Sequence, residues 1–257
     1  MTSASTAGRR ETRRLGIEVV LSVAAVFAVL LVLGWLVTGP LAHTWPISAE
    51  DGVNRGLAAH RNHTLDDVSG VFSTLANTPS AIALSGVAFL VIRLLTHRWR
   101  PALFVAATLI CEVGVFLLTT LVIDRGRPAV VHLDAAPPTS SFPSGHVAAA
   151  VALYGAVALV ARRYGAPWVV WLILLIPCAV GFARLYRGMH HPSDVVAGAV
   201  LGALCLLLTH HFVLRQPRRA VSAGGRLNPA RSRRSRTPRR PESRPPARPR
   251  RAAPGRR

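Results

Sequence analysis

The sequence contains no lysine, and few of its 257 residues carry charge of either sign. All 31 basic residues are arginine, and only 11 residues are acidic. Charged residues make up 16% of the chain, whereas they account for roughly 25% of an ordinary soluble domain. With 51% hydrophobic residues and a mean hydropathy of +0.36, the composition argues against such a domain. The formal net charge is nevertheless +20, so charged and apolar residues must occupy separate parts of the chain.

Cysteine is also scarce. The three cysteines, Cys111, Cys178 and Cys205, all fall within long apolar runs, at no evident spacing for a disulfide or a metal site. We therefore predict no disulfide and expect all three to be packing residues.

Six apolar runs are present that can cross a hydrocarbon core of roughly 30 Å. They cover residues 16–39, 79–96, 101–123, 144–161, 167–183 and 193–214. In lipid the backbone must satisfy its own hydrogen bonds, so such runs form helices. The expected fold is all-α, a polytopic membrane protein with a bundle of six transmembrane helices in residues 16–214. Glu112 lies inside the third run, and we expect it to snorkel toward the cytoplasmic end.

The arginines predict the orientation of this bundle. Six helices place both termini on one side, and that side receives 25 of the 31 arginines. Because positive charge stays in the cytoplasm, both termini are predicted to be cytoplasmic and the protein to lie in the plasma membrane. The loops after the first, third and fifth helices then face outward.

Three segments flank or interrupt the bundle. Residues 1–15 are a basic cytoplasmic N-terminus. Residues 44–77 carry apolar side chains at helical spacing and are expected to form an extracytoplasmic amphipathic helix that packs over the bundle. Residues 215–257 are rich in arginine and proline, with a single acid, and are expected to be disordered. This tail should be attracted to the anionic inner leaflet, with no specific nucleic-acid partner.

Two of the predicted outward loops contain polar side chains suited to phosphate chemistry. One reads "DRGRPAVVHLDAAPPTSSFPSGH", and the other reads "ARLYRGMHHPSD". Both loops join helix ends at the same membrane face, so their side chains can converge. The candidate site residues are Arg127, Ser144, Gly145, His146, Arg184, His190 and Asp194.

Each of these residue types has a physical use in binding or transferring phosphate. Pro143 suits the first position of a helix, which would aim the following N–H groups outward at an anion. Gly145 lets a ligand approach the backbone, and arginine forks grip phosphate oxygens. Pro192 would open the last helix, from which Asp194 can reach back to His190 and raise its basicity.

The motifs "TLVIDRGRP", "PSGH" and "ARLYRGMHHPSD" together resemble those of the type 2 phosphatidic acid phosphatase (PAP2) family. These are membrane lipid phosphatases related to vanadium haloperoxidases. The resemblance implies hydrolysis of a lipid phosphate or diphosphate, such as polyprenyl diphosphate, phosphatidic acid or phosphatidylglycerol phosphate. It also implies that His190 forms a phosphohistidine, that Asp194 orients His190, and that His146 protonates the leaving group. The phosphate-binding groups would be Arg127, Arg184, Ser144 and the Gly145 N–H.

Two positions depart from the family motifs. Thr120 stands where the family has lysine, and Ala183 stands where it has serine. Arg125 lies in the same loop as Arg127 and is a candidate replacement for the missing positive charge. These departures keep an alternative open, a non-catalytic membrane protein that binds or carries lipid phosphates. Metal-dependent phosphatases need several converging carboxylates, and the motif loops offer only Asp124, Asp134 and Asp194, so we expect no metal and no cofactor.

Overall fold

The computed structural model describes residues 3–165 and 169–214, and this part of the chain contains helices and no strand. The long helices are α1 (Ser3–Thr38), α4 (Thr78–Thr96), α5 (Trp99–Val122), α6 (Gly145–Arg163), α7 (Val169–Tyr186) and α8 (Pro192–Thr209). Five of them, with α8 extended to Leu214, are long and apolar enough to cross a membrane. In α7 the described apolar stretch, Ile173–Tyr186, is shorter. These helices match the six predicted runs, so the expectation of an all-α, multi-pass membrane fold is confirmed.

Helix α6 packs against α5, α7 and α8, and small residues bring it close to α8. A Cβ atom added to Gly198 would collide with the carbonyl oxygen of Ser144, and one added to Gly202 would lie 2.6 Å from the carbonyl oxygen of Ala148. Small residues at this spacing allow such close approach between membrane helices. The contact brings the start of α8 against the start of α6, where the candidate residues lie.

Helices α5 and α8 meet through two pairs of polar or sulfur atoms. The Thr108 and Thr209 hydroxyls are 2.7 Å apart, and the sulfurs of Cys111 and Cys205 are 3.5 Å apart. All three cysteines are free thiols. This contact could not be predicted from the sequence, because it joins two helices that are distant along the chain.

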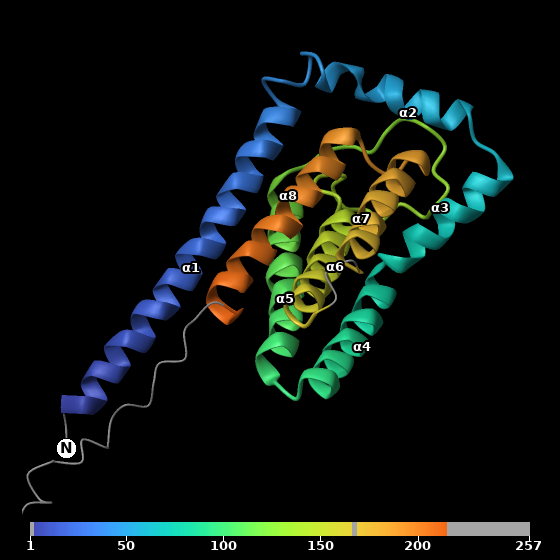
Figure 1. Cartoon of the computed structure of the whole chain (residues 1–257). Coiled ribbons are helices and arrows are strands. Elements are labelled where there is room, and N and C mark those ends of the chain that lie inside the picture. The colour runs from blue at the N-terminus through green and yellow to red at the C-terminus, as the bar shows by residue number, and fades with distance from the viewer. Residues whose placement is uncertain (1–2, 166–168, 215–257) are drawn as a thin grey trace, which may run out of the picture. The chain divides into compact units, whose positions relative to one another are not determined.

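A short helical segment crosses one end of the bundle (Figure 1). It consists of a 3₁₀ turn (Ile47–Ala49), α2 (Glu50–Ala59) and α3 (His63–Leu75). The expected amphipathic segment is therefore helical, but the buried face of α3 is the polar one. Ser69 and Ser73 are buried, whereas Leu65 and Val68 are exposed. The reason is that α3 covers a loop whose charged side chains bond to these serines.

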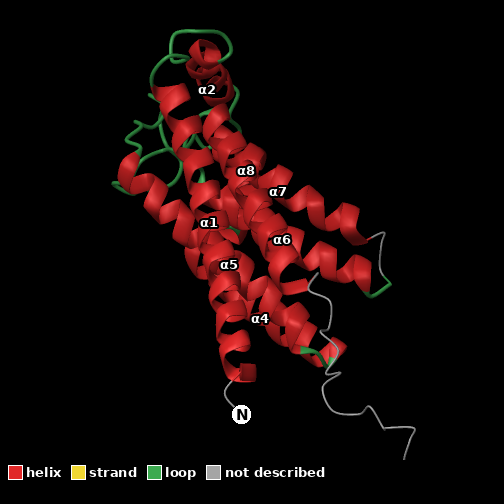
Figure 2. Cartoon of the chain, turned by 90° about the vertical axis from the view of Figure 1, so that its left-hand side faces the viewer, coloured by secondary structure: helices red, strands yellow, loops and turns green. Residues whose placement is uncertain are grey.

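The two motif loops lie at the same end of the bundle as α2, while α1 begins at the opposite end (Figure 2). The Leu133 N–H donates to the carbonyl of Arg187 at 3.1 Å, and the Ser144 N–H donates to that of Asp194 at 3.0 Å. The predicted convergence of the two loops is thus confirmed. The predicted basic tail, residues 215–257, lies outside the described residues.

Candidate active site

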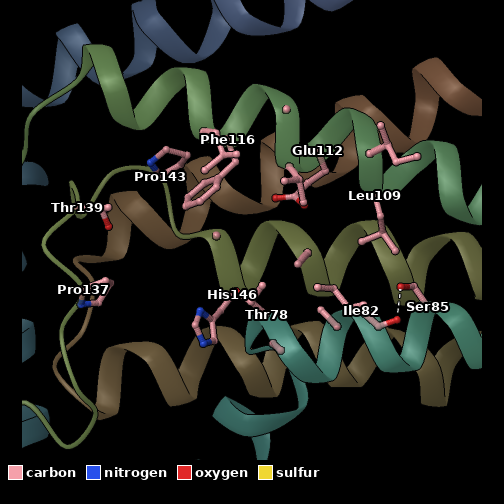
Figure 3. A pocket seen from close by; sticks show the side chains of 18 of the residues that line it. Thr78, Ile82, Ser85, Leu109, Glu112, Phe116, Pro137, Thr139, Pro143 and His146 are labelled. Atoms are coloured by element: carbon pink, nitrogen blue, oxygen red, sulfur yellow. Dashed lines mark hydrogen bonds between the residues drawn. The ribbon is translucent and has the colours of Figure 1, made fainter.

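A cavity of about 950 Å³ connects the motif loops with the apolar interior between α4 and α5 (Figure 3). Five of the predicted site residues line it, namely Arg127, Gly145, His146, Arg184 and His190. The rest of the wall is mostly apolar and includes Ile82, Phe89, Leu109 and Phe116. The cavity therefore joins a cationic end to an apolar compartment.

The His190 ring is held in one tautomer. Its Nδ1 lies 2.8 Å from the carbonyl oxygen of Ser141, and the side chain is almost completely buried. A carbonyl can only accept, so Nδ1 carries the proton and the Nε2 lone pair stays available. Burial, and after it the positive charge of Arg184, lowers the pKa of His190 to about 3. The structure therefore presents a neutral imidazole with a free nitrogen.

Asp194 differs from the expectation that it bonds directly to His190. Its Oδ2 is 3.9 Å from His190 Nδ1, whereas it accepts at 2.8 Å from the backbone N–H of His191 and also from the Ser141 hydroxyl. The reason is helical offset: Pro192 opens α8, so His191 is the N-cap and the carboxylate at the third position reaches back three residues. Asp194 is therefore linked to His190 indirectly: it accepts a hydrogen bond from the Ser141 hydroxyl, and the Ser141 carbonyl accepts one from His190.

Arg125 is not available to replace the missing lysine. Its guanidinium donates to Glu50 at 2.8 Å and to Asp194 at 2.5 Å, and it also donates to Ser193. Glu50 is buried and also accepts from the Ser193 N–H at 2.6 Å. With two carboxylates already bound, Arg125 stabilises the start of α8, and it is not among the residues that line the cavity, so its contacts do not support the expectation that it binds phosphate. Thr120 does not substitute either, since its hydroxyl donates to the Leu117 carbonyl of its own helix.

Arg184 is fixed by Asp134, a residue to which sequence analysis assigned no role. One Arg184 nitrogen donates to Asp134 at 2.7 Å and to Ser73 at 2.7 Å. Asp134 also accepts from Arg187 at 2.8 Å. Burial works to raise the pKa of Asp134, but hydrogen bonds from Arg187 and Ser73 and the two arginine charges lower it on balance. The Asp134 carboxylate, which does not itself line the cavity, thus positions Arg184.

Three buried atoms near His190 have no hydrogen-bond partner. They are Nε of Arg127, Nε of Arg184 and Oγ of Ser144. Arg127 is oriented by a hydrogen bond of 2.8 Å that its Nη1 donates to the carbonyl of Met189. Leaving buried polar groups unpaired is costly, and native proteins rarely do so without a functional reason. Two of the three belong to arginines that line the cavity, so an anion held there would be a partner for them.

The start of α6 supplies further donors, two residues later than predicted. Ser144 is the N-cap and α6 begins at Gly145, so Pro143 precedes the helix instead of opening it. The first N–H groups of a helix have no acceptor within it, and here they follow directly on Ser144. A Cβ on Gly145 would lie 2.8 Å from the Phe116 ring, so the glycine is also required by packing.

The sequence motifs gave no sign of Ser141, Glu50 or Asp134 as supporting residues. Ser141 stands inside the quoted stretch "PPTSSFPSGH", and Asp134 is an acid in a loop with few others. Glu50 gave no such signal, because its contact with Ser193 spans 143 residues of sequence. Among the described residues, no group of three or more histidine, cysteine or acidic side chains could hold a metal ion.

Comparison with known proteins identifies the family. The model of the PAP2 superfamily matches residues 74–218, more than half of the chain. Undecaprenyl-diphosphatase BcrC of Bacillus subtilis is 31% identical over 160 residues, which cover 60% of this chain and 78% of BcrC. A lipid A 1-phosphatase of Rhizobium johnstonii is 42% identical over 71 residues, but these cover only 27% of this chain and 26% of that protein.

Solved structures agree on the fold. The transmembrane PAP2-type phosphatidylglycerolphosphate phosphatase of Bacillus subtilis superposes with a TM-score of 0.67 at 21% identity, covering 77% of this chain and 98% of that one. Aquifex aeolicus LpxE gives a TM-score of 0.50 at 23% identity, covering 62% and 93%. With the family model and BcrC, this likeness shows that the chain belongs to the PAP2 superfamily of membrane phosphatases.

Proposed function

We propose that the protein hydrolyses a lipid phosphate or diphosphate at the extracytoplasmic membrane face, through a phosphohistidine on His190. The observation that carries this proposal is the set of three buried, unpaired groups on Arg127, Arg184 and Ser144. Arg127 and Arg184 line the apolar cavity together with the neutral His190, and Ser144 caps α6, whose first residues Gly145 and His146 also line it. The cationic end would hold the phosphate and the apolar compartment would hold the lipid chain.

In the first chemical step, the Nε2 lone pair of His190 attacks phosphorus and the bond from phosphorus to the lipid or phosphate oxygen breaks. His146, which lines the same cavity, gives a proton to the departing oxygen. In the second step a water gives its proton to His146 and its oxygen to phosphorus, which frees His190 and releases phosphate. The unpaired donors hold the charge that gathers on the equatorial oxygens.

The positions of the loops support an extracytoplasmic site. Both motif loops lie at the end of the bundle away from the start of α1, whose flank is basic (Figure 2). Positive flanks remain in the cytoplasm. Reporter fusions after residue 135 should therefore report outside and fusions after residue 164 inside, and the reverse at both points would place the site in the cytoplasm.

Phosphate release by the purified full chain in detergent tests the proposal. A panel of phosphatidic acid, phosphatidylglycerol phosphate and polyprenyl diphosphate should include at least one substrate, with activity retained in excess EDTA and blocked by vanadate. The His190→Ala variant is the matched control and should release no phosphate. If the wild type binds these lipids and releases phosphate from none, the chain is a lipid-phosphate binder or carrier. Activity lost in EDTA and restored by magnesium would contradict the metal-free mechanism.

A further inference from the structure

Glu112 is a buried carboxyl in the wall of the apolar cavity. It lies at the middle of α5, with only 1% of its surface exposed, and it lines the same cavity as His146 and His190. The expectation that it snorkels to the cytoplasmic end is therefore wrong. Figure 3 shows Glu112 and Phe116 both pointing from α5 toward α6.

The Glu112 carboxyl has a buried oxygen without a hydrogen bond, Oε2. The ion pairs between described residues do not include it; the arginines near the cavity are bound to Asp134, Glu50 and Asp194 instead. Another polar residue of the apolar wall, Ser85, is satisfied locally, because its hydroxyl donates to the Ile82 carbonyl at 2.8 Å. An isolated charge in such surroundings is very costly, so the group is held as the neutral acid. A neutral carboxylic acid can donate one hydrogen bond and accept others.

The depth of Glu112 suits a lipid that carries oxygen near its phosphate. The Phe116 ring lies against Gly145 at the start of α6. Glu112 lies four residues deeper on the same helix, about 6 Å farther from the phosphate end. In a glycerolipid phosphate the ester carbonyls lie a few bonds from phosphorus, at about this depth. A polyprenyl chain has only hydrocarbon there.

From this placement we propose that Glu112 donates a hydrogen bond to an ester carbonyl of the substrate and thereby selects glycerolipid phosphates over polyprenyl phosphates. The inference rests on the proposed function, since it assigns the substrate class of that same site. On this proposal the substrate makes polar contacts with the cavity wall at two depths. Arg127 and Arg184 would hold the phosphate, and Glu112 would hold the carbonyl. The cost of leaving Glu112 unpaired is then offset when the substrate binds.

Three substrates and two variants test the inference. The substrates are a diacyl phosphatidic acid, its dialkyl ether analogue, which lacks the carbonyls, and farnesyl phosphate. All are presented to the full chain in the same detergent micelles. Glu112→Gln keeps a donor of nearly the same shape, whereas Glu112→Leu removes all hydrogen bonding. Thr108→Val is the matched control, because Thr108 is a buried polar residue of α5 that bonds to Thr209 and does not line the cavity.

The decisive quantity is the ratio of kcat/KM for the diacyl substrate to kcat/KM for each of the other two. Loss of one hydrogen bond predicts a fall of about tenfold in both ratios for Glu112→Leu. Glu112→Gln should keep them within about threefold, and Thr108→Val should leave them unchanged. Unchanged ratios in an active Glu112→Leu variant, or an equal loss on all three substrates, would overturn the inference and leave the proposed function standing. A wild type that hydrolyses farnesyl phosphate but not the diacyl substrate would overturn the inference alone, whereas one that hydrolyses none of the three and none of the wider lipid panel would overturn both.

Discussion

The Ser141 carbonyl oxygen accepts a hydrogen bond from Nδ1 of His190 at 2.8 Å, while the Ser141 hydroxyl donates to Asp194. Ser141 thus links the proposed nucleophile to the carboxylate that the motif pairs with it. This contact holds the imidazole with Nε2 toward the cavity, whereas the negative charge of Asp194 acts from 3.9 Å. The arrangement fixes the tautomer through a backbone group that no side-chain substitution removes.

Substitution of Ser141 and Asp194 should therefore have unequal effects. Ser141→Ala keeps the carbonyl and loses only the hydroxyl, so kcat should fall by no more than about tenfold. Asp194→Asn removes the charge that Ser141, Arg125 and His191 all contact, and kcat should fall by about 10²-fold or more with little change in KM. Steady-state kinetics on one lipid phosphate would measure both. A larger loss in Ser141→Ala than in Asp194→Asn would contradict the indirect support of His190.

The buried position of His190 predicts a particular dependence on pH. Its folded-state pKa of about 3 is below the value of roughly 6.5 expected in the unfolded chain. As pH falls below 6.5 the unfolded chain takes up a proton that the folded protein does not. The free energy of unfolding should therefore fall between about pH 6.5 and 3 and be unaffected by this group above pH 7.

Melting temperatures in detergent at pH 7.5 and 4.5 would measure this effect. The wild type should lose more stability between the two conditions than His190→Asn, which keeps a donor for Ser141 and cannot titrate. Equal losses in the two proteins would show that His190 titrates in its ordinary range.

Arg125 should behave as a structural cation. Arg125→Met leaves the buried carboxylates of Glu50 and Asp194 without their positively charged partner, which predicts a loss of about 3–5 kcal/mol in the free energy of unfolding. Adding Glu50→Gln should restore part of the melting temperature, because it removes one of the unpaired charges. Inhibition by inorganic phosphate should remain unchanged in any folded variant. A large rise in the phosphate inhibition constant for Arg125→Lys, at unchanged melting temperature, would instead show that Arg125 contacts phosphate.

Asp134 should act by holding Arg184. Asp134→Asn removes the negative charge of the carboxylate that pairs with both Arg184 and Arg187, so Arg184 should lose its fixed position. We expect phosphate and vanadate to bind about tenfold more weakly. Asp124→Asn is the matched control, since Asp124 is an exposed residue of the same loop. Equal inhibition constants for the two variants would contradict this role of Asp134.

The sequence predicted those parts of the site that depend on residues close together in the chain. The six apolar runs and the spacing within each motif are local patterns, and they located the helices, the two loops and the histidines. The partners of Arg184 and Arg125 could not be found in the same way. Asp134 and Glu50 reach them across 50 and 75 residues of chain, and only the packing of α2, α3 and the motif loops brings them together.

The prediction that the apolar face of α3 packs against the bundle was wrong for a related reason. Apolar spacing at Leu65 and Val68 indicated a helix, but spacing alone does not say which surface the helix meets. Here that surface is a polar loop, so Ser69 and Ser73 turn inward to bond Arg187 and Asp134.

The central claim is that His190 carries the phosphoryl group during the reaction. Rapid acid-free quenching of the full chain with a lipid labelled in its terminal phosphate, followed by peptide mapping, tests this directly. The account predicts label on His190 that is lost in acid and stable in base, and none in His190→Ala. Turnover without any labelled protein, or label on another residue that persists in His190→Ala, would contradict the account.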